Sequence, residues 1–334
     1  MQTGCDKIYL IENALSELAD NHHSCHLCPR ECGVNRNIGK TGFCEIGNFP
    51  VVSTYCLHYG EEPCLSGYFD YENGKKTGTS LSGSGAVFFS GCNLGCIFCQ
   101  NYQISRQIHG STVSPEKLSS IFLYLQEKKA LNINLGTPTH IIIPILEALK
   151  KAISLGLRIP IVYNTSAYDS YETIKKLSGI IDIYLPDFKY IKKDTALRFS
   201  RAQDYTERAT KAITEMYRQV GNLVIDDEGN ARKGLIIRHL ILPGHTEEAC
   251  AILKWIASNL SIEVCLSLMS QFHPCDNVGN DLSRSLSPEE YNVVLSKAEE
   301  LGFENVYLQT NPSITESYLL PDFNRKNPFS WNGI

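Results

Sequence analysis

Short apolar runs alternate with longer amphipathic segments from residue 86 onward, and this alternation limits the possible folds more than any other feature. Apolar runs of this length predict strands, here at 86–90, 131–135, 159–164, 181–185, 235–242, 264–271 and 305–309. The longer segments predict helices at 115–129, 139–155, 172–177, within 194–220, at 247–259 and at 288–301. Strand–helix alternation gives a parallel sheet with right-handed crossovers. We therefore expect an α/β fold, a partial (β/α)6-type barrel.

Polar residues follow the predicted strands closely. They are Cys92, Thr137, Asn164, Asp187, His245 and His273. In a βα barrel these positions form the C-terminal rim, where such enzymes carry their chemistry. One segment departs from the simple alternation, because the DDEGN of 226–230 predicts a hairpin turn before the fifth strand.

The first 85 residues predict a different organisation. A helical pattern over 8–20 is followed by a Cys-, Gly- and Pro-rich segment without sustained periodicity, and 66–85 indicates an exposed loop or hairpin insert. We expect three parts: a Cys-rich, mostly irregular extension (1–85), the barrel (86–310) and a tail (311–334). The tail is expected to pack over the open side of the barrel, with a substrate lid as the alternative.

Composition excludes several classes of protein. Hydrophobic residues make up 43% and charged residues 20% of the chain, which is the balance of a globular protein. No apolar stretch approaches the ~18 residues of a membrane span. The net charge of −5 argues against a broad nucleic-acid surface. With no signal-peptide pattern at the N-terminus, we expect a cytoplasmic protein.

The thirteen cysteines point to metal or redox chemistry. Ten of them precede residue 100. An odd number of cysteines without an export signal disfavours a disulfide framework, because the cytosol keeps thiols reduced.

The segment SGCNLGCIFCQN places Cys92, Cys96 and Cys99 in a C-x3-C-x2-C pattern directly after the first predicted strand of the barrel. Three closely spaced thiolates can bind three irons of a cubane cluster and leave the fourth iron open. A zinc knuckle completed by a distant ligand, or three thiols without a metal, is the alternative. Zinc knuckles favour paired C-x2-C clips, whereas only half of this pattern has that spacing.

A second cysteine block lies upstream. Cys25, Cys28, Cys32 and Cys44 give four soft ligands in a Gly-rich segment with few apolar residues. A metal could supply the folding free energy that such a segment lacks. Zinc and an auxiliary iron–sulfur cluster both suit four thiolates, and free thiols are the alternative. Cys56 and Cys64 are nearby substitutes if one of the four is not a ligand.

The triplet resembles that of the radical SAM superfamily. The surrounding sequence resembles the pyruvate formate-lyase activating enzyme-like proteins of unassigned substrate. The matching segments are LCPRECGVNR, GFC, EEPCLSG and FFSGCNLGCIFCQNYQIS. The resemblance implies that Cys92, Cys96 and Cys99 hold a [4Fe–4S] cluster whose open iron binds S-adenosylmethionine (SAM). One electron would then cleave SAM to a 5′-deoxyadenosyl radical, which abstracts hydrogen from a substrate.

The resemblance also implies positions that contact SAM. Phe98 would pack near the adenine, with a core phenylalanine as the alternative. Gly136 and Thr137 stand where relatives have a Gly-Gly-Glu-Pro-like bend, although the second Gly and the Glu are missing here. The remaining matches are Asn164, Asp187, Lys189, Arg238 and His273. Taken singly, each is better explained as a satisfied polar group at the barrel mouth, whereas their convergence on one rim favours a functional site. We expect His58, Glu61 and Glu62 to lie in a solvated loop, with contact to substrate at the rim as the alternative.

The implied function is hydrogen abstraction, with a glycyl-radical-type protein partner as one substrate. Activases of that kind carry eight further ferredoxin-like cysteines, whereas this chain has only Cys250, Cys265 and Cys275 after the triplet. Modification of a small molecule, peptide or RNA is therefore an alternative, and so is an iron–sulfur electron-transfer or sensing protein. The chemistry requires a one-electron reductant such as flavodoxin or ferredoxin.

Overall fold

The computed structural model describes residues 4–67, 71–72, 75–76, 82–274, 280–309, 321–325 and 328–329, with backbone alone for 71–72, 75–76 and 280. Most of the predicted tail, and Cys275, lie outside the described residues. The insert at 68–81 is described only as a small antiparallel hairpin of β2 (Tyr71–Glu72) and β3 (Lys75–Lys76).

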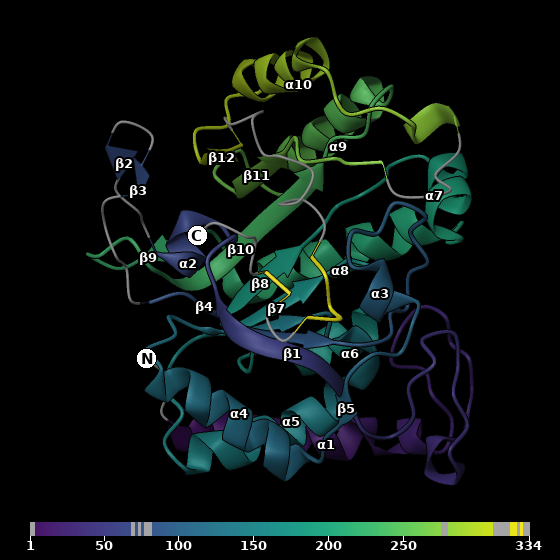
Figure 1. Cartoon of the computed structure of the whole chain (residues 1–334), viewed down its shortest axis with the longest axis vertical. Coiled ribbons are helices and arrows are strands. Elements are labelled where there is room, and N and C mark those ends of the chain that lie inside the picture. Colours follow the sequence, from purple (N-terminus) through teal and green to yellow (C-terminus); the bar gives the residue numbers. More distant parts are fainter. Residues whose placement is uncertain are drawn as a thin grey trace.

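One large sheet organises the described chain (Figure 1). Its parallel strands run in the spatial order β12-β11-β10-β8-β7-β6-β4. They are β4 (Ser84–Phe89), β6 (Ile133–Gly136), β7 (Ile161–Thr165), β8 (Ile183–Pro186), β10 (Ala231–Leu240), β11 (Cys265–Met269) and β12 (Val306–Leu308). Beyond β4 the antiparallel strands β1 (Val51–His58) and β5 (Ser111–Thr112) extend the sheet. The predicted hairpin turn joins β9 (Val224–Ile225) to β10.

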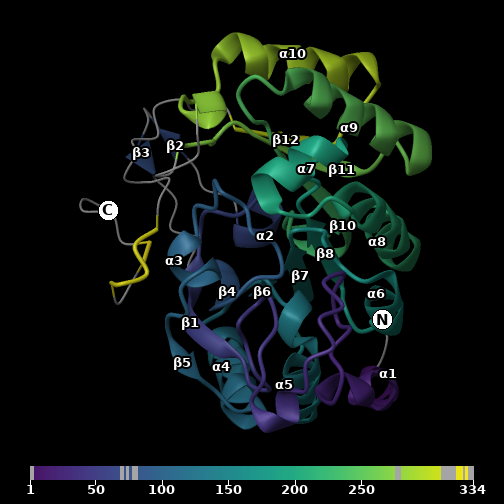
Figure 2. The same cartoon turned by 90° about the vertical axis from the view of Figure 1, so that its right-hand side faces the viewer.

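Helices connect the parallel strands on the outside of the sheet (Figures 1 and 2). They are α4 (Pro115–Glu127), α5 (Ile142–Ser154), α6 (Tyr171–Lys176), α7 (Lys193–Ser200), α8 (Tyr205–Val220), α9 (Thr246–Asn259) and α10 (Pro288–Glu300). Short 3-10 turns occupy Ala19–His22, Arg36–Ile38, Thr139–Ile141 and Asn280–Leu282. Six strand–helix crossovers followed by β12 confirm the partial (β/α)6-type barrel. Gly156 and Gly302 follow α5 and α10 with positive φ, as expected for glycines that end helices.

The N-terminal helix α1 (Gly4–Leu18) packs against α5 and α6 at one end of the molecule. Lys7 Nζ lies 2.8 Å from both carboxylate oxygens of Asp182, just ahead of β8. The predicted division of the chain at residues 85 and 310 stays a prediction.

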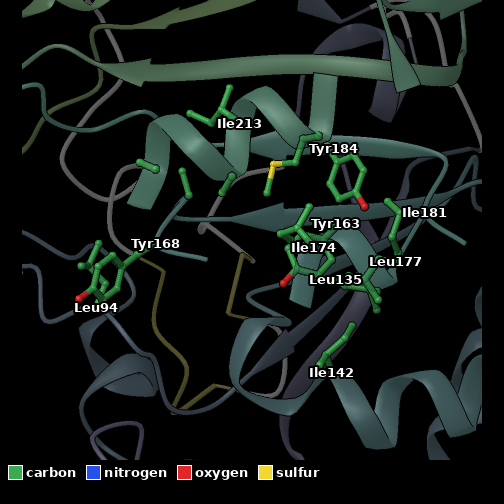
Figure 3. Close-up of a cluster of buried hydrophobic side chains, with 14 of the residues drawn as sticks. Leu94, Leu135, Ile142, Tyr163, Tyr168, Ile174, Leu177, Ile181, Tyr184 and Ile213 are labelled. Atoms are coloured by element: carbon green, nitrogen blue, oxygen red, sulfur yellow. The ribbon is translucent and has the colours of Figure 1, made fainter. Parts of the chain in front are cut away.

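The core between the sheet and its helices is aromatic and aliphatic (Figure 3). Tyr163 of β7 and Tyr184 of β8 meet edge to face, with ring centroids 5.7 Å apart. Ile174 of α6 and Ile213 of α8 are fully buried in the same cluster. These helices present apolar residues at 3.6-residue spacing, and the strands present them at alternate positions.

The interior of the barrel has its own apolar plug. Cys64 and Leu65 of the short helix α2 (Pro63–Ser66) pack with a set of buried residues on the inner faces of the strands. These are Val162, Ile183, Leu185, Ala231, Ile236 and Cys265. Asn132, just before β6, donates through Nδ2 to the Leu65 carbonyl at 2.8 Å. The plug closes the barrel near the start of its strands.

Strand β1 corrects the sequence analysis, which expected residues 25–85 to be mostly irregular. Residues 51–58 form an eight-residue strand that pairs with β4, His58 opposite Ser84 and Leu57 opposite Gly85. The segment is only partly buried over most of its length, so local periodicity is weak. The antiparallel ladder with β4 stabilises it instead.

Replacing Ser287 should destabilise the protein measurably. Ser287 Oγ accepts from the Glu290 amide at 3.2 Å, and the Glu290 carboxylate accepts from the Ser287 amide at 3.0 Å, which forms a capping box for α10. Ser287→Ala should cost about 1 kcal/mol, or about 2 °C in Tm in a protein of this size. Ser120→Ala, at an exposed position inside α4, is the control and should leave Tm unchanged. Equal shifts for both variants would show that the cap contributes nothing.

Candidate active site

The loop that follows β4 carries the cysteine triplet at the C-terminal edge of the parallel strands. Its first turn depends on Gly91, which has φ 80°. A Cβ at this position would lie 2.4 Å from the Cys44 carbonyl oxygen and 2.5 Å from Ile46. Only glycine avoids that collision. The segment around Cys44 therefore packs directly against the triplet loop at Gly91.

The three cysteines of the triplet all accept hydrogen bonds at sulfur. Leu94 N donates to Cys92 Sγ at 3.3 Å, Ser200 Oγ donates to Cys96 Sγ at 3.0 Å and Ser105 Oγ donates to Cys99 Sγ at 3.3 Å. Burial raises the pKa of the Cys92 and Cys96 thiols, and a neighbouring thiol of the triplet raises each further. Donors at every sulfur suit thiolates that bind a cluster. This donor set fits a [4Fe–4S] cluster with three protein ligands.

Lys189 lies beside the triplet on the loop that follows β8. Its Nζ donates to Asp187 Oδ2 at 2.6 Å. Burial alone would lower the pKa of Lys189, but Asp187 and Cys96 raise it above its ordinary value. The lysine therefore carries its charge at neutral pH. Asp187 is held in turn by its amide, which donates to the Thr165 carbonyl at 2.8 Å.

The ends of β6 and β7 bring Gly136 and Asn164 together. The two residues are direct partners in the parallel ladder, and Asn164 Nδ2 lies 3.8 Å from where a Gly136 Cβ would stand. The peptide bond from Gly136 to Thr137 is cis. Side chains on a strand alternate between faces, so Asn164 lies above Val162, Asp187 above Leu185 and Arg238 above Ile236. Asn164, Asp187 and Arg238 thus share the inner face of the barrel, above the α2 plug.

Phe98 lies in an aromatic cluster below the triplet loop. It is 5% exposed and meets Tyr190, Phe199 and Phe272 edge to face, with ring centroids 6.1 to 6.5 Å apart. Gln100 Nε2 donates to the Gln271 carbonyl at 3.0 Å. These contacts bring the segment that contains His273 to the triplet loop. His245, in contrast, is the N-cap residue of α9 and packs edge to face on Phe199, with ring centroids 5.2 Å apart.

Arg238 has partners that the sequence did not reveal. Glu62 accepts from Arg238 Nε at 2.7 Å and from Nη2 at 2.6 Å, and Glu61 accepts a further hydrogen bond from Nη2. The side chains of Glu62 and Glu61 are only 5% and 7% exposed, so the expectation of a solvated loop is wrong. Burial would raise the pKa of Glu62, but Arg238 holds it below its ordinary value. This ion pair anchors the segment that leads into α2.

His58 extends this network toward the tail. Its Nδ1 lies 3.5 Å from Glu61 Oε1. Its ring packs on Phe329 and Phe88, with centroids 4.4 and 5.8 Å away, and Phe323 packs on Phe88 at 5.8 Å. The described tail residues 321–325 and 328–329 therefore lie in front of β1 (Figure 1), against the ends of β1 and β4. No sequence spacing could have shown this, because the tail contacts residues more than two hundred positions away.

A pocket separates the two cysteine blocks. It has a volume of about 380 Å³, and both Cys44 and Cys92 line it, together with Phe43, Arg106 and Arg201. Among the described residues no three His, Cys, Asp or Glu side chains already surround a single-ion site. The fit of either block to a metal centre therefore rests on donor chemistry and neighbouring contacts.

Comparison with known proteins identifies the family. The model of the radical SAM superfamily matches residues 86–256, which include the triplet, Lys189 and Arg238. The chain belongs to the radical SAM superfamily. Enzymes of this superfamily use SAM and a [4Fe–4S] cluster and need a one-electron reductant. The subgroup within the superfamily stays a prediction.

Named relatives add little about the reaction. The uncharacterized protein MJ0674 of Methanocaldococcus jannaschii is 31% identical over 304 residues, 87% of this chain and 79% of the relative. A radical SAM methyltransferase from Sphaerobacter thermophilus is 14% identical with a TM-score of 0.48, over 70% of this chain and 68% of that one. Methylornithine synthase is 15% identical with a TM-score of 0.44, over 67% and 70%. These TM-scores are too low to carry an argument about function.

Within the described residues, no helix is long and apolar enough to cross a membrane.

Replacing Arg238 should destabilise the protein strongly. Arg238→Met leaves the two buried carboxylates of Glu61 and Glu62 without a cation, which typically costs about 3–5 kcal/mol. Lys211→Met removes an exposed pair with Glu207 and is the matched control, expected to cost less than about 0.5 kcal/mol. Thermal or denaturant unfolding of the two variants measures the difference. A stability loss for Arg238→Met no larger than that for Lys211→Met would contradict the anchoring role.

Proposed function

We propose that this protein is a radical SAM enzyme that cleaves SAM reductively at a [4Fe–4S] cluster held by Cys92, Cys96 and Cys99. The observation that carries the proposal is the set of three sulfurs on one loop, each with a hydrogen-bond donor, beside a charged lysine at the barrel rim. When bound, the cluster and SAM supply a 5′-deoxyadenosyl radical for hydrogen abstraction.

The residues around the triplet would bind and orient SAM. The Lys189 ammonium, oriented by Asp187, would neutralise the methionyl carboxylate. The backbone of Gly136 and Thr137 would receive the methionyl amine. Asn164 and His273 would contribute further polar contacts at the same rim.

Phe98 and Arg238, both predicted to contact SAM, also make contacts within the protein. Phe98 is buried among aromatic rings, so it would support the adenine from within the core. Arg238 is already paired with the carboxylates of Glu61 and Glu62. It would therefore act on SAM through the net charge of these three side chains. Because Glu61 and Glu62 together carry one charge more than Arg238 offsets, this side of the site favours a cationic neighbour such as the SAM sulfonium.

The substrate is proposed at the level of class. Activation of a glycyl-radical-type protein is our first candidate, on the resemblance of the residues 25–105 to activating enzymes. Modification of a small molecule, peptide or RNA is the second, on the lack of the eight ferredoxin-like cysteines. An electron-transfer or sensing protein would not need the polar set at the rim. The electron would come from a flavodoxin or ferredoxin, and we retain a cytoplasmic location as a prediction.

Cleavage of SAM without substrate tests the proposal. Protein reconstituted with iron and sulfide under anaerobic conditions should form 5′-deoxyadenosine when dithionite and SAM are added. Cys96→Ala should abolish the product, whereas Cys250→Ala, which replaces a partly buried cysteine on α9, should not. Wild-type protein with an intact, reducible cluster and no product, even with candidate substrates present, would favour the electron-transfer alternative.

Lys189→Met tests the role of the lysine in SAM binding. Loss of a charged hydrogen bond to the carboxylate should weaken SAM binding by about 10- to 100-fold. Lys193→Met, on the exposed start of α7, is the matched control and should bind SAM as wild type does. Equilibrium dialysis with labelled SAM on proteins of equal iron content measures both. Unchanged affinity in Lys189→Met would rule out the carboxylate contact.

The reaction proposed here uses only the cluster of the triplet loop. The second metal predicted at Cys25, Cys28, Cys32 and Cys44 would be a separate centre that takes no direct part in SAM cleavage.

A further inference from the structure

The segment between α1 and β1 folds three of its cysteines into one tight turn. Cys25 N donates to the Val34 carbonyl at 3.1 Å, and Gly33 N donates back to the Cys25 carbonyl at 3.0 Å. Glu31 N donates to the Cys28 carbonyl at 3.0 Å. These bonds bring Cys25, Cys28 and Cys32 together without a regular helix or strand.

The fourth cysteine approaches the same turn from the other side. A Cβ on Gly42 would lie 2.5 Å from Cys32 Sγ, so the arm that carries Cys44 crosses directly over Cys32. Cys32 Sγ donates to the Cys25 carbonyl oxygen at 3.9 Å, within the same turn. The four cysteines therefore lie in one compact segment, although among the described residues no three of their sulfurs already surround a single-ion site.

Arg36 supplies an independent observation at this cluster. Its side chain is 5% exposed, and its Nη2 donates to Cys44 Sγ at 3.6 Å. Nη1 donates to the carbonyls of Gly47 and His140 at 3.1 and 2.8 Å, while Nε has no partner among the residues that the structure describes. No ion pair to a carboxylate forms at Arg36 in the described part of the chain. A buried guanidinium is costly unless an anion compensates it.

We propose that Cys25, Cys28, Cys32 and Cys44 bind a thiophilic metal centre, whose negative charge Arg36 balances. Four thiolates around a divalent ion leave a charge of about −2, and so do four thiolates around an oxidised [4Fe–4S] cluster. Arg36 offsets one of these charges and thereby gains the anionic partner that it otherwise lacks. Soft thiolate ligands select zinc or iron–sulfur centres.

The metal would also fix one wall of the active site. Arg30, between Cys28 and Cys32, donates through Nε to the Asn93 carbonyl at 2.9 Å and through Nη1 to the Arg201 carbonyl at 2.7 Å. Its guanidinium stacks on Phe43, 3.8 Å from the ring centroid. Asn93 follows Cys92, and Phe43 precedes Cys44. Through these contacts of Arg30, the loop that would hold the second centre is fixed against the triplet loop.

Elemental analysis of full-length variants tests the proposal separately from the proposed SAM chemistry. A chain with Cys92→Ala, Cys96→Ala and Cys99→Ala cannot hold the first cluster. Purified anaerobically, it should retain one centre per chain, either zinc or iron with matching acid-labile sulfide. Adding Cys28→Ala should remove that centre, whereas adding Cys5→Ala, at an exposed site on α1, should not. Zinc and iron–sulfide both support the proposal and identify the metal.

Arg36→Met provides a test that keeps all four cysteines. Loss of the balancing charge should weaken metal binding by about 10- to 100-fold, as loss of outer contacts at metal sites typically does. Competition with a chelator, applied to the triple-alanine chain with and without Arg36→Met, measures this ratio. A triple-alanine chain without zinc or iron would overturn the proposal, and unchanged affinity in Arg36→Met would overturn the role of Arg36.

Discussion

The parallel register of β4, β6, β7, β8 and β10 is the constraint on which the site depends. Phe88 stands opposite Gly136, Gly136 opposite Asn164, and Asp187 bridges to Arg238. Because all these strands run in one direction, residues that lie far apart in the chain reach the same edge of the sheet. A shift of one residue in any strand would turn its polar side chain to the outer face.

The barrel interior combines an apolar lower half with a charged upper half. Helix α2 fills the lower half with Cys64 and Leu65, and the preceding Glu61 and Glu62 reach Arg238 above it. One short segment thus closes the barrel and places two carboxylates at its mouth. This dual role explains why residues 61–66, although outside a long element, are buried or half-buried. It also couples the stability of the plug to the electrostatics of the site.

Sequence reasoning succeeded where the information is local. The strands and helices of the barrel, the hairpin turn at 226–230 and the positions of Cys92, Asn164 and Asp187 follow from periodicity and from the strand ends. It failed for β1, whose pairing with β4 is not visible in a partly exposed eight-residue pattern. It also missed the contact of Arg238 with Glu62, which lies 176 positions away, and that of Arg30 with Arg201, 171 positions away. Such contacts depend on the assembled barrel.

The central claim is that the triplet holds a cluster whose open iron binds SAM. Electron paramagnetic resonance of the reduced, reconstituted protein tests this most directly, with spectra recorded before and after SAM is added. In the Cys28→Ala variant any signal from the second cysteine block is removed, so the remaining signal belongs to the triplet. The account predicts that SAM changes this signal, because its amino and carboxylate groups become ligands. A reduced cluster whose spectrum is the same with and without SAM would contradict it.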